Sequence, residues 1–239
     1  MKVKDLKLDF SDVLIEPCES EITLTRKSVD IEIEWLDTTA TPVIVSNMLS
    51  TGTYKIANIL TPERIFTFIH KEYTVEQHIN ELEKMKDRRF IAITSGVRLQ
   101  DREKTIEVIS KFPDIGIINV DIANVYANIQ GMIDTIKLYR EKFPNIQICA
   151  GNVATASPIQ KFVKAGATLI KVGVGSGAAC RTRSEVGTGV PQLSAIMDCY
   201  TEAQKYGAGI ISDGGCVTAG DVCKAIGAGA KMVMVAGMV

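Results

Sequence analysis

The sequence predicts an α/β protein, a (β/α)₈ TIM barrel of eight parallel strands, and two observations lead to this prediction. Short β-branched or apolar runs recur eight times along the chain, and amphipathic segments with polar starts lie between them. Apolar runs of this length are typical of parallel strands that are buried on both faces. Eight such runs within 239 residues fit one closed barrel better than an open doubly wound sheet.

The expected elements follow one another in regular order. An N-terminal segment, residues 1–40, precedes the barrel and carries a small hairpin over residues 31–35. The runs expected as strands are 42–48, 65–71, 90–96, 116–123, 146–152, 169–175, 209–215 and 232–238. The segments expected as helices include 74–86, 102–112, 128–143, 155–166 and 218–229. Glycines in "KAGAT" and "AIGAGAK" are typical of left-handed helix caps that lead into the next strand.

The whole chain, residues 1–239, is expected to form a single catalytic domain. Its last residues make up the eighth expected strand, and no helix follows them. A strand end without cover leaves backbone groups and apolar side chains without partners. We therefore expect the native protein to continue beyond Val239 with a last helix and further covering elements.

Composition and charge argue against several classes of partner. Apolar residues make up 46% of the chain and charged residues 23%, which is typical of a globular domain. A formal net charge of −1 gives no general attraction to nucleic acid or to an anionic membrane. The start, "MKVKDLKLDF", lacks the apolar core of a signal peptide, and no apolar run approaches the roughly 18 residues of a membrane span. Six cysteines without a C-x-x-C pair indicate a reducing compartment, so we expect a cytoplasmic protein.

Polar side chains collect where the expected strands end, and in this fold the chemistry lies at the carboxyl ends of the strands. These residues are Asn47, Lys71, Ser95, Asp121, Asn152 and Asp213, together with a glycine-rich loop that carries Cys180. Each has a structural alternative, because asparagine and serine at strand ends commonly cap turns, and a lysine can simply be solvated. Their gathering at one end of the barrel indicates an active site.

The stretch "GVGSGAACRTR", residues 173–183, places a cysteine after a run rich in glycine and serine. Glycines let the backbone turn tightly and present amides to an anion or carbonyls to a monovalent cation. Arg181 and Arg183 favour the thiolate, which is the nucleophilic form. We expect Cys180 to be catalytic; the alternative is a structural thiol in a loop that only binds phosphate. The other cysteines are expected to be small buried apolar residues: Cys18, Cys149, Cys199, Cys216 and Cys223.

The stretch "SDGG", residues 212–215, ends the seventh expected strand with a carboxylate followed by glycines. An aspartate can accept hydrogen bonds from both hydroxyls of a ribose, and glycine amides can approach a phosphate. Loops after strands seven and eight are the usual phosphate site of this barrel, and the eighth strand leads into Ala236 and Gly237. A phosphate, a ribose and a thiol near a base describe a nucleotide whose ring is attacked by sulfur.

Eight stretches, in order along nearly the whole chain, together resemble one family. They are "LDFSDVLIEP", "SNM", "HKEY", "VDIAN", "AGNVAT", "KVGVGSGAACRTR", "GVPQLSAI" and "ISDGGC". This series is similar to the inosine monophosphate (IMP) dehydrogenase and guanosine monophosphate (GMP) reductase family. "VDIAN" and the uninterrupted run from "IHKEY" into "TVEQ" resemble the reductase branch, since the dehydrogenase usually carries inserted regulatory modules there. "GSGAAC" is closer to the dehydrogenase form, because the reductase commonly has proline where Ser176 stands.

The resemblance implies NADPH-dependent reductive deamination of GMP to IMP and ammonia, a step of purine nucleotide salvage. By this resemblance Cys180 adds to C2 of the purine and forms a covalent thioimidate, while Thr182 relays protons. Lys71 and Asp121 resemble groups that flank the nicotinamide and the departing ammonia. The residue types agree with this chemistry, because a carbon that bears an amino group accepts hydride only after sulfur addition and loss of ammonia create an electrophilic C=N unit.

The resemblance also implies ligand-binding residues, the cofactors NADPH and potassium, and a homotetramer. The substrate-binding residues that it implies are Asn152, Ser176, Asp213, Gly214, Gly215, Ala236 and Gly237. The cofactor-binding residues that it implies are Lys71, Ser95, Asp121, Ile122, Ala123, Val174 and Gly175. Gly175, Gly177, Cys180 and Arg183 resemble a ring of backbone carbonyls around a monovalent cation.

Two positions depart from the family pattern, and two alternatives to the reductase stay open. Leu49 stands where the family has an aspartate, and Arg181 replaces a smaller residue after the cysteine. The family's mobile flap, with the glutamate that activates its threonine, is expected beyond Val239. The alternatives are a dehydrogenase that acts on IMP with NAD, and a nucleotide-binding regulatory or scaffold subunit without turnover.

Overall fold

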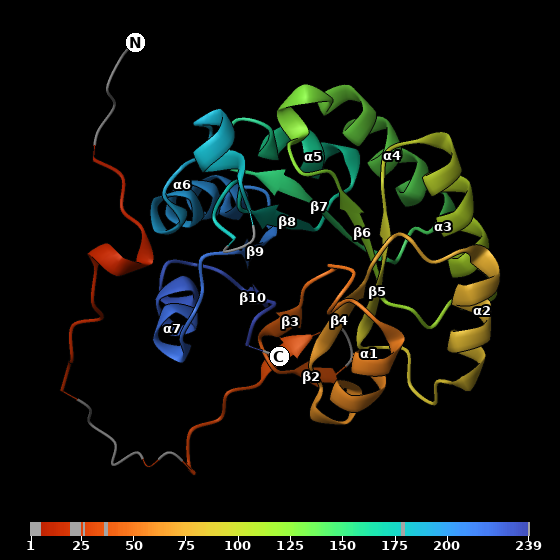
Figure 1. Cartoon of the computed structure of the whole chain (residues 1–239), viewed down its shortest axis with the longest axis horizontal. Helices are drawn as coiled ribbons and strands as arrows, with labels where there is room; N and C mark the ends of the chain where they lie inside the picture. The colour runs from red at the N-terminus through yellow and green to blue at the C-terminus, as the bar shows by residue number, and fades with distance from the viewer. Residues whose placement is uncertain (1–5, 20–24, 26, 36–37, 178–179, 239) are drawn as a thin grey trace.

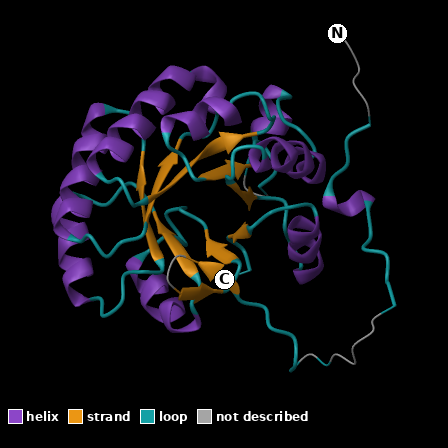
Figure 2. Cartoon of the chain, turned by 180° about the vertical axis from the view of Figure 1, so that it is seen from behind, coloured by secondary structure: helices purple, strands orange, loops and turns teal. Residues whose placement is uncertain are grey.

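The computed structural model describes residues 6–19, 25, 27–35, 38–177 and 180–238. Eight parallel strands close into a barrel in the order β10-β3-β4-β5-β6-β7-β8-β9. Figures 1 and 2 show helices ringing the outside of these strands. The predicted (β/α)₈ barrel is therefore confirmed, and each expected strand overlaps one of the eight barrel strands, of which β7 extends one residue beyond its expected end.

The barrel strands are between 3 and 7 residues long, and each corresponds to one of the apolar runs of the sequence. They are β3 (Val43–Val45), β4 (Phe66–Ile69), β5 (Ile91–Ser95), β6 (Ile117–Asp121), β7 (Gln147–Val153), β8 (Leu169–Val172), β9 (Gly209–Asp213) and β10 (Met232–Val235). β10 pairs with both β9 and β3, and the second of these pairings closes the barrel.

The expected helices form, and further helices lie next to them. They are α1 (Tyr54–Leu60), α2 (Val75–Lys84), α3 (Leu99–Lys111), α4 (Ile129–Lys142), α5 (Ile159–Ala165), α6 (Gln192–Gln204) and α7 (Ala219–Gly227). Gly166, with φ of +118°, provides the expected left-handed cap of α5. None of the described helices is long and apolar enough to span a membrane.

The core has two layers because side chains alternate along each strand. On β8, Leu169 points into the barrel, while Ile170 and Val172 pack outward against the helices. The inner layer contains Ile44, Phe66, Phe68, Ala92, Ile117, Cys149, Leu169, Ile211, Met232 and Met234. Lys171 shares the inward face of β8 with Leu169, so this alternation brings a lysine into the barrel interior.

The expected N-terminal hairpin also forms, from β1 (Ile33–Trp35) and β2 (Thr38–Ala40), which pair antiparallel. Trp35 is buried, and its ring lies 5.1 Å from that of Phe66 at the start of β4. Phe66 lies 5.3 Å from Phe90, just before β5. The hairpin therefore covers the amino end of the barrel and leaves the carboxyl end to the loops.

The earlier part of the N-terminal segment lies outside the barrel beside α6 and α7 (Figure 1). It contains one short 3₁₀ turn, η1 (Phe10–Asp12). Phe10 is buried, and its carbonyl accepts a hydrogen bond of 2.8 Å from Lys224 of α7. The segment is thus attached to the helical layer of the barrel.

Candidate active site

Three charged side chains meet inside the carboxyl end of the barrel. Lys171 of β8 forms ion pairs with Asp121, at the end of β6, and with Asp213, at the end of β9, the second at 3.1 Å. Lys171 is only 1% exposed, whereas the carboxylates reach toward the opening. Burial alone would lower the pKa of the Lys171 ammonium, but the two carboxylates outweigh it and raise this pKa above its ordinary value. The lysine is therefore a fixed cation that orients both carboxylates.

Asn152 joins this cluster from the end of β7. Its Nδ2 donates hydrogen bonds of 2.7 Å to Asp213 and to the carbonyl of Gly173. Its buried Oδ1 has no hydrogen-bond partner among the described residues. The backbone N–H of Asn152 donates a hydrogen bond of 2.8 Å to the carbonyl of Ile122, which places Asn152 beside the end of β6. The amide therefore presents a free acceptor next to Asp121 and Asp213.

Cys180 lies on an exposed loop that follows β8, and its thiol contacts the hydroxyl of Thr182. The distance from Sγ to Oγ1 is 3.2 Å. Hydrogen bonding to Thr182 lowers the pKa of the Cys180 thiol below its ordinary value, and the charge of Arg183 contributes in the same direction. An accessible cysteine with a lowered pKa is the form of thiol that acts as a nucleophile.

The loop after β8, which carries Cys180, packs against the end of β9 and the loop that follows it, where Asp213 and Gly214 lie. The hydroxyl of Ser176 donates a hydrogen bond of 2.8 Å to the carbonyl of Asp213. Gly214 has φ of +88°, and a Cβ there would lie 2.7 Å from the backbone nitrogen of Gly177. Only glycine fits this close approach without strain. Ser176, Gly177 and Gly214 therefore lie together.

A second close approach occurs at Gly175, next to Arg183. Gly175 has φ of +77°, and a Cβ there would lie 2.7 Å from Cγ of Arg183. The Arg183 guanidinium donates to the carbonyl of Val190 at 2.7 Å and forms an ion pair with Asp9 at 3.0 Å. The contacts of the Arg183 side chain therefore hold the loop in place. They do not involve the backbone carbonyl of Arg183, which is predicted to bind a cation.

The remaining predicted residues fall into three groups. Lys71 is exposed on the loop between β4 and α2, at the same end of the barrel. Ile122 and Ala123 follow Asp121, Val174 and Gly215 follow β8 and β9, and Ala236 and Gly237 follow β10. Ser95 is different: its buried hydroxyl donates to the carbonyl of Gly96 and bonds to Tyr139 of α4. The structure therefore does not bring the Ser95 side chain to the site.

The prediction that five cysteines are buried is wrong in part. Cys149 and Cys199 are buried, and burial raises the pKa of each to about 12. Cys216 is half-buried, whereas Cys18 and Cys223 are exposed. Cys18 lies on the N-terminal segment outside the barrel, and Cys223 lies on the solvent side of α7. Composition could not distinguish them, because the exposed face of a helix is known only once the helix is placed.

Two residues that contact the candidate site were not predicted from the sequence, Lys171 and Asp9. The signal for Lys171 is visible: it is the one charged residue in the otherwise apolar run 169–175. A charge within a strand that is buried on both faces must be paired or functional. The position of Asp9 gives no such signal, because its partner Arg183 is 174 residues away along the chain.

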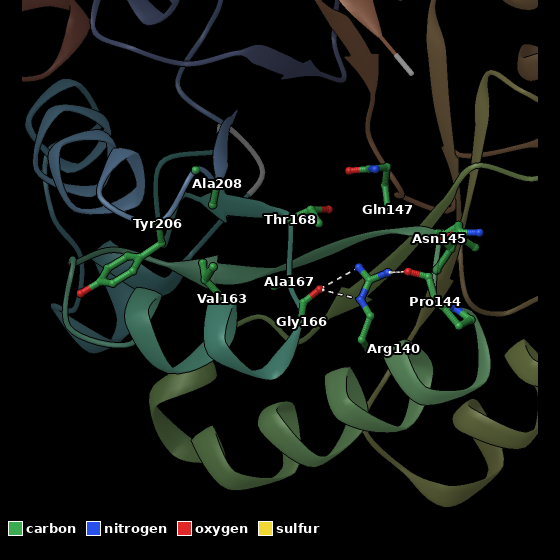
Figure 3. A pocket seen from close by; sticks show the side chains of 12 residues that line it. Arg140, Pro144, Asn145, Gln147, Val163, Gly166, Ala167, Thr168, Tyr206 and Ala208 are labelled. Carbon is green, nitrogen blue, oxygen red and sulfur yellow. Dashed lines mark hydrogen bonds between the residues drawn. The ribbon is translucent and has the colours of Figure 1, made fainter. Parts of the chain in front are cut away.

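Two cavities formed by described residues lie at the opposite end of the barrel. The cavity in Figure 3, of about 450 Å³, is formed where β7, β8 and β9 begin. The Arg140 guanidinium there is occupied by the carbonyls of Gly166 and Pro144. A second hollow of about 620 Å³ lies where β5 begins. In this fold the chemistry lies at the carboxyl ends of the strands, so neither hollow is the candidate site.

Comparison with known proteins gives one consistent result. The family model for the IMP dehydrogenase / GMP reductase domain matches residues 7–239. GMP reductase 1 of Homo sapiens is 39% identical over 244 residues, which cover 98% of this chain and 69% of the relative. GMP reductase of Yersinia pestis (strain Pestoides F) is 36% identical over 247 residues, covering 100% and 70%. A solved inosine 5′ monophosphate dehydrogenase from Legionella pneumophila superposes with a TM-score of 0.87 at 30% identity, over 98% of this chain and 70% of that one.

Proposed function

Because the chain belongs to the IMP dehydrogenase/GMP reductase family, we propose that it is a GMP reductase, which converts GMP to IMP and ammonia with NADPH. The observation that supports this most is the exposed Cys180 thiol, which lies 3.2 Å from the hydroxyl of Thr182 and whose pKa is lowered by this hydrogen bond. The relatives named GMP reductase, at 36% to 39% identity over nearly the whole chain, support the choice of reaction.

The residues present fit a nicotinamide cofactor and a monovalent cation. The free Oδ1 of Asn152 is suited to accept from an amide or ring N–H of a bound base or carboxamide. The described residues contain no cluster of histidine, cysteine and carboxylate ligands that could hold a metal ion. A cation at the thiol loop would therefore be held by neutral carbonyl oxygens, those of Gly175, Gly177, Cys180 and Arg183, which suits potassium better than a transition metal.

The reaction begins with the Cys180 thiolate. Sulfur adds to C2 of the purine, so a C–S bond forms and electron density moves onto the ring nitrogen. The amino group at C2 takes up a proton and leaves as ammonia when the C–N bond breaks. We assign the relay of this proton to Thr182, whose hydroxyl lies 3.2 Å from the sulfur. Lys71 is exposed on the loop after β4, at the same end of the barrel. The product of this half-reaction is a thioimidate on Cys180.

NADPH, when bound, supplies the hydride that reduces C2. The C–S bond then breaks, the electron pair returns to Cys180 as a thiolate, and IMP is released. Across both half-reactions GMP, NADPH and two protons become IMP, NADP⁺ and ammonium. Asp121 is fixed beside this reaction by Lys171, and the same lysine fixes Asp213 as the acceptor for the ribose hydroxyls.

The test is turnover with GMP and NADPH in a potassium buffer, followed by the loss of the reduced nicotinamide absorbance and by ammonia release. Cys180→Ala should abolish turnover, since no other group can form the thioimidate. Cys223→Ala is the matched control, because Cys223 is also exposed but lies on α7. Mass spectrometry of the quenched wild-type reaction should find the purine attached to Cys180.

Two results would contradict the proposal. Turnover that survives Cys180→Ala would exclude the covalent mechanism. Turnover of IMP with NAD, without turnover of GMP, would instead assign the dehydrogenase, which the "GSGAAC" form of the loop and the solved dehydrogenase structure favour. Binding of GMP without either turnover would assign a nucleotide-binding subunit.

Family membership supports three further proposals. We propose potassium as the cation, a homotetramer as the assembly and the cytoplasm as the location. Replacement of potassium by sodium in the assay tests the first, and the sedimentation velocity of the purified protein tests the second.

A further inference from the structure

Asp9 of the N-terminal segment contacts Arg183 at the carboxyl end of the barrel. We propose that Asp9 is a positioning residue for the loop that carries Cys180 and Thr182. The thiol loop is defined here as residues 180–191, and the N-terminal brace as residues 7–12. The inference rests on the proposed function only in that it takes Cys180 as the nucleophile.

The two oxygens of Asp9 hold two different parts of the molecule. Oδ2 accepts a hydrogen bond of 3.0 Å from Nη1 of Arg183 in the thiol loop. Oδ1 accepts from the backbone N–H of Gln192, the first residue of α6. The same guanidinium donates through Nη2 to the carbonyl of Val190 at 2.7 Å. These contacts connect the brace to Arg183 in the thiol loop and to Gln192 at the start of α6, and they connect Arg183 to Val190 near the end of the loop.

The start of α6 needs an acceptor that its own sequence does not supply. Its N-cap is Pro191, which makes no side-chain capping bond. The first N–H groups of a helix lack intrahelical partners, and a negative charge is favourable at this end. Asp9, which is distant in sequence, supplies both the acceptor and the charge. The carboxylate therefore fixes the point at which the thiol loop becomes a helix.

The brace itself is held in place on both sides of Asp9. The backbone N–H of Leu8 donates to the hydroxyl of Ser194 at 2.9 Å, and the N–H of Ser194 donates to the carbonyl of Leu8 at 3.1 Å. On the other side Phe10 is buried, and its carbonyl accepts from Lys224. The Asp9 carboxylate is thus presented from a fixed backbone.

The thiol loop has few anchors of its own. None of residues 180–189 is buried, and Val186 is 70% exposed. Its internal bonds, from Glu185 to the carbonyl of Arg181 and from Gly187 to that of Arg183, close one turn without attaching it to the barrel. Arg183 directly follows Thr182, so the position of its side chain governs where the Thr182 hydroxyl lies relative to Cys180.

The experiment follows the thiol loop itself, without nucleotide. Asp9→Asn keeps the size of the side chain and an oxygen for Gln192 but removes the charge that faces Arg183. Hydrogen exchange of the backbone amides is measured for wild type and variant by mass spectrometry of peptides. We expect the amides of residues 180–191 to exchange about tenfold faster in the variant, because the loop has lost its charged contact with the brace. The kcat with GMP should fall with KM little changed, and the amides of α3 should exchange at an unchanged rate.

The matched control is Asp198→Asn. It removes the 2.8 Å ion pair from Lys7 to Asp198, which ties the same brace to α6 without contacting the thiol loop. Its exchange at residues 180–191 should equal that of wild type. Arg183→Gln removes the same contact from the loop side together with the bond to Val190, so exchange in the double variant should be no faster than in Arg183→Gln alone.

A folded Asp9→Asn protein with wild-type exchange at residues 180–191 would overturn the proposal, as would additive effects in the double variant. If Asp9→Asn does not fold, Arg183→Gln tests the same contact from the loop side. The result is separate from the proposed function, since turnover by Cys180→Ala would contradict the covalent mechanism but would leave the exchange rates as they are.

Discussion

At the scale of single residues, the candidate site depends on a cation enclosed in the barrel. Lys171 is buried and paired with Asp121 and Asp213, which face different parts of the bound nucleotides in the proposed reaction. A buried ion pair contributes little net stability, but removal of one partner leaves an uncompensated charge. Lys171 is therefore expected to fix orientation, and its loss is expected to be costly.

Lys171→Met should lower the free energy of unfolding by about 3 to 5 kcal/mol, because two carboxylates then face each other without a cation. Denaturant unfolding at pH 7 measures this change. The triple variant with Asp121→Asn and Asp213→Asn should recover much of the lost stability, since no unpaired charge remains. A single variant as stable as wild type would show that the two carboxylates do not depend on the lysine.

At the scale of elements, the loop between β4 and α2 is held from a neighbouring helix. Lys104 of α3 donates hydrogen bonds to the carbonyls of Lys71 and Tyr73, the latter at 3.1 Å. Within the loop the rings of His70 and Tyr73 stack at 4.3 Å. α2 then begins at Val75, and its N-cap Thr74 forms a reciprocal capping box with Gln77. The position of Lys71 is thus set by α3 as much as by its own loop.

Lys104→Met should lower kcat by about 10-fold to 100-fold with the fold intact, because misplacement of a catalytic group by about 1 Å has effects of this size. Steady-state kinetics with GMP and NADPH measure it. Lys111→Met is the matched control: Lys111 lies on the same helix and pairs with Glu83 on the surface, so kcat should stay at the wild-type value. Equal kinetics for both variants would mean that the loop does not need Lys104.

At the scale of the whole molecule, the two ends of the barrel have separate tasks. The amino end is filled by Trp35, Phe66 and Phe90, whose rings are in edge or tilted contact. The carboxyl end carries the charged cluster and the thiol loop. Stability and chemistry are therefore expected to respond to different substitutions.

Trp35→Ala should lower the free energy of unfolding by about 3 to 5 kcal/mol, since it removes a buried aromatic side chain and leaves a cavity. The thermal midpoint should fall, while kcat of the folded fraction should stay unchanged, because the substitution lies at the end away from Cys180. Glu34→Ala on the same strand, where the side chain is exposed, should change neither quantity. A large fall in kcat at a temperature where Trp35→Ala is folded would show that the two ends are coupled.

The sequence by itself determined the barrel, the order of its strands and the end at which chemistry collects. Apolar runs of strand length alternate with amphipathic segments, and these local patterns are decided by burial and side-chain period. Cys180, Asp213 and Gly214 could be singled out because a glycine-rich turn beside a thiol or a carboxylate is itself a local signal. The Cys223 prediction failed because a pattern of residue types does not show which side of a helix faces solvent.

Only the tertiary structure decided which distant groups meet. Lys171 becomes a partner of Asp121 and Asp213 because barrel closure turns one face of β8 inward between β6 and β9. Asp9 reaches Arg183 because the N-terminal segment returns across α6. Ser95 ends a strand, as the sequence indicates, but the alternation of side chains along β5 turns its hydroxyl outward to Tyr139. Each outcome depends on long-range geometry, which residue spacing along the chain does not encode.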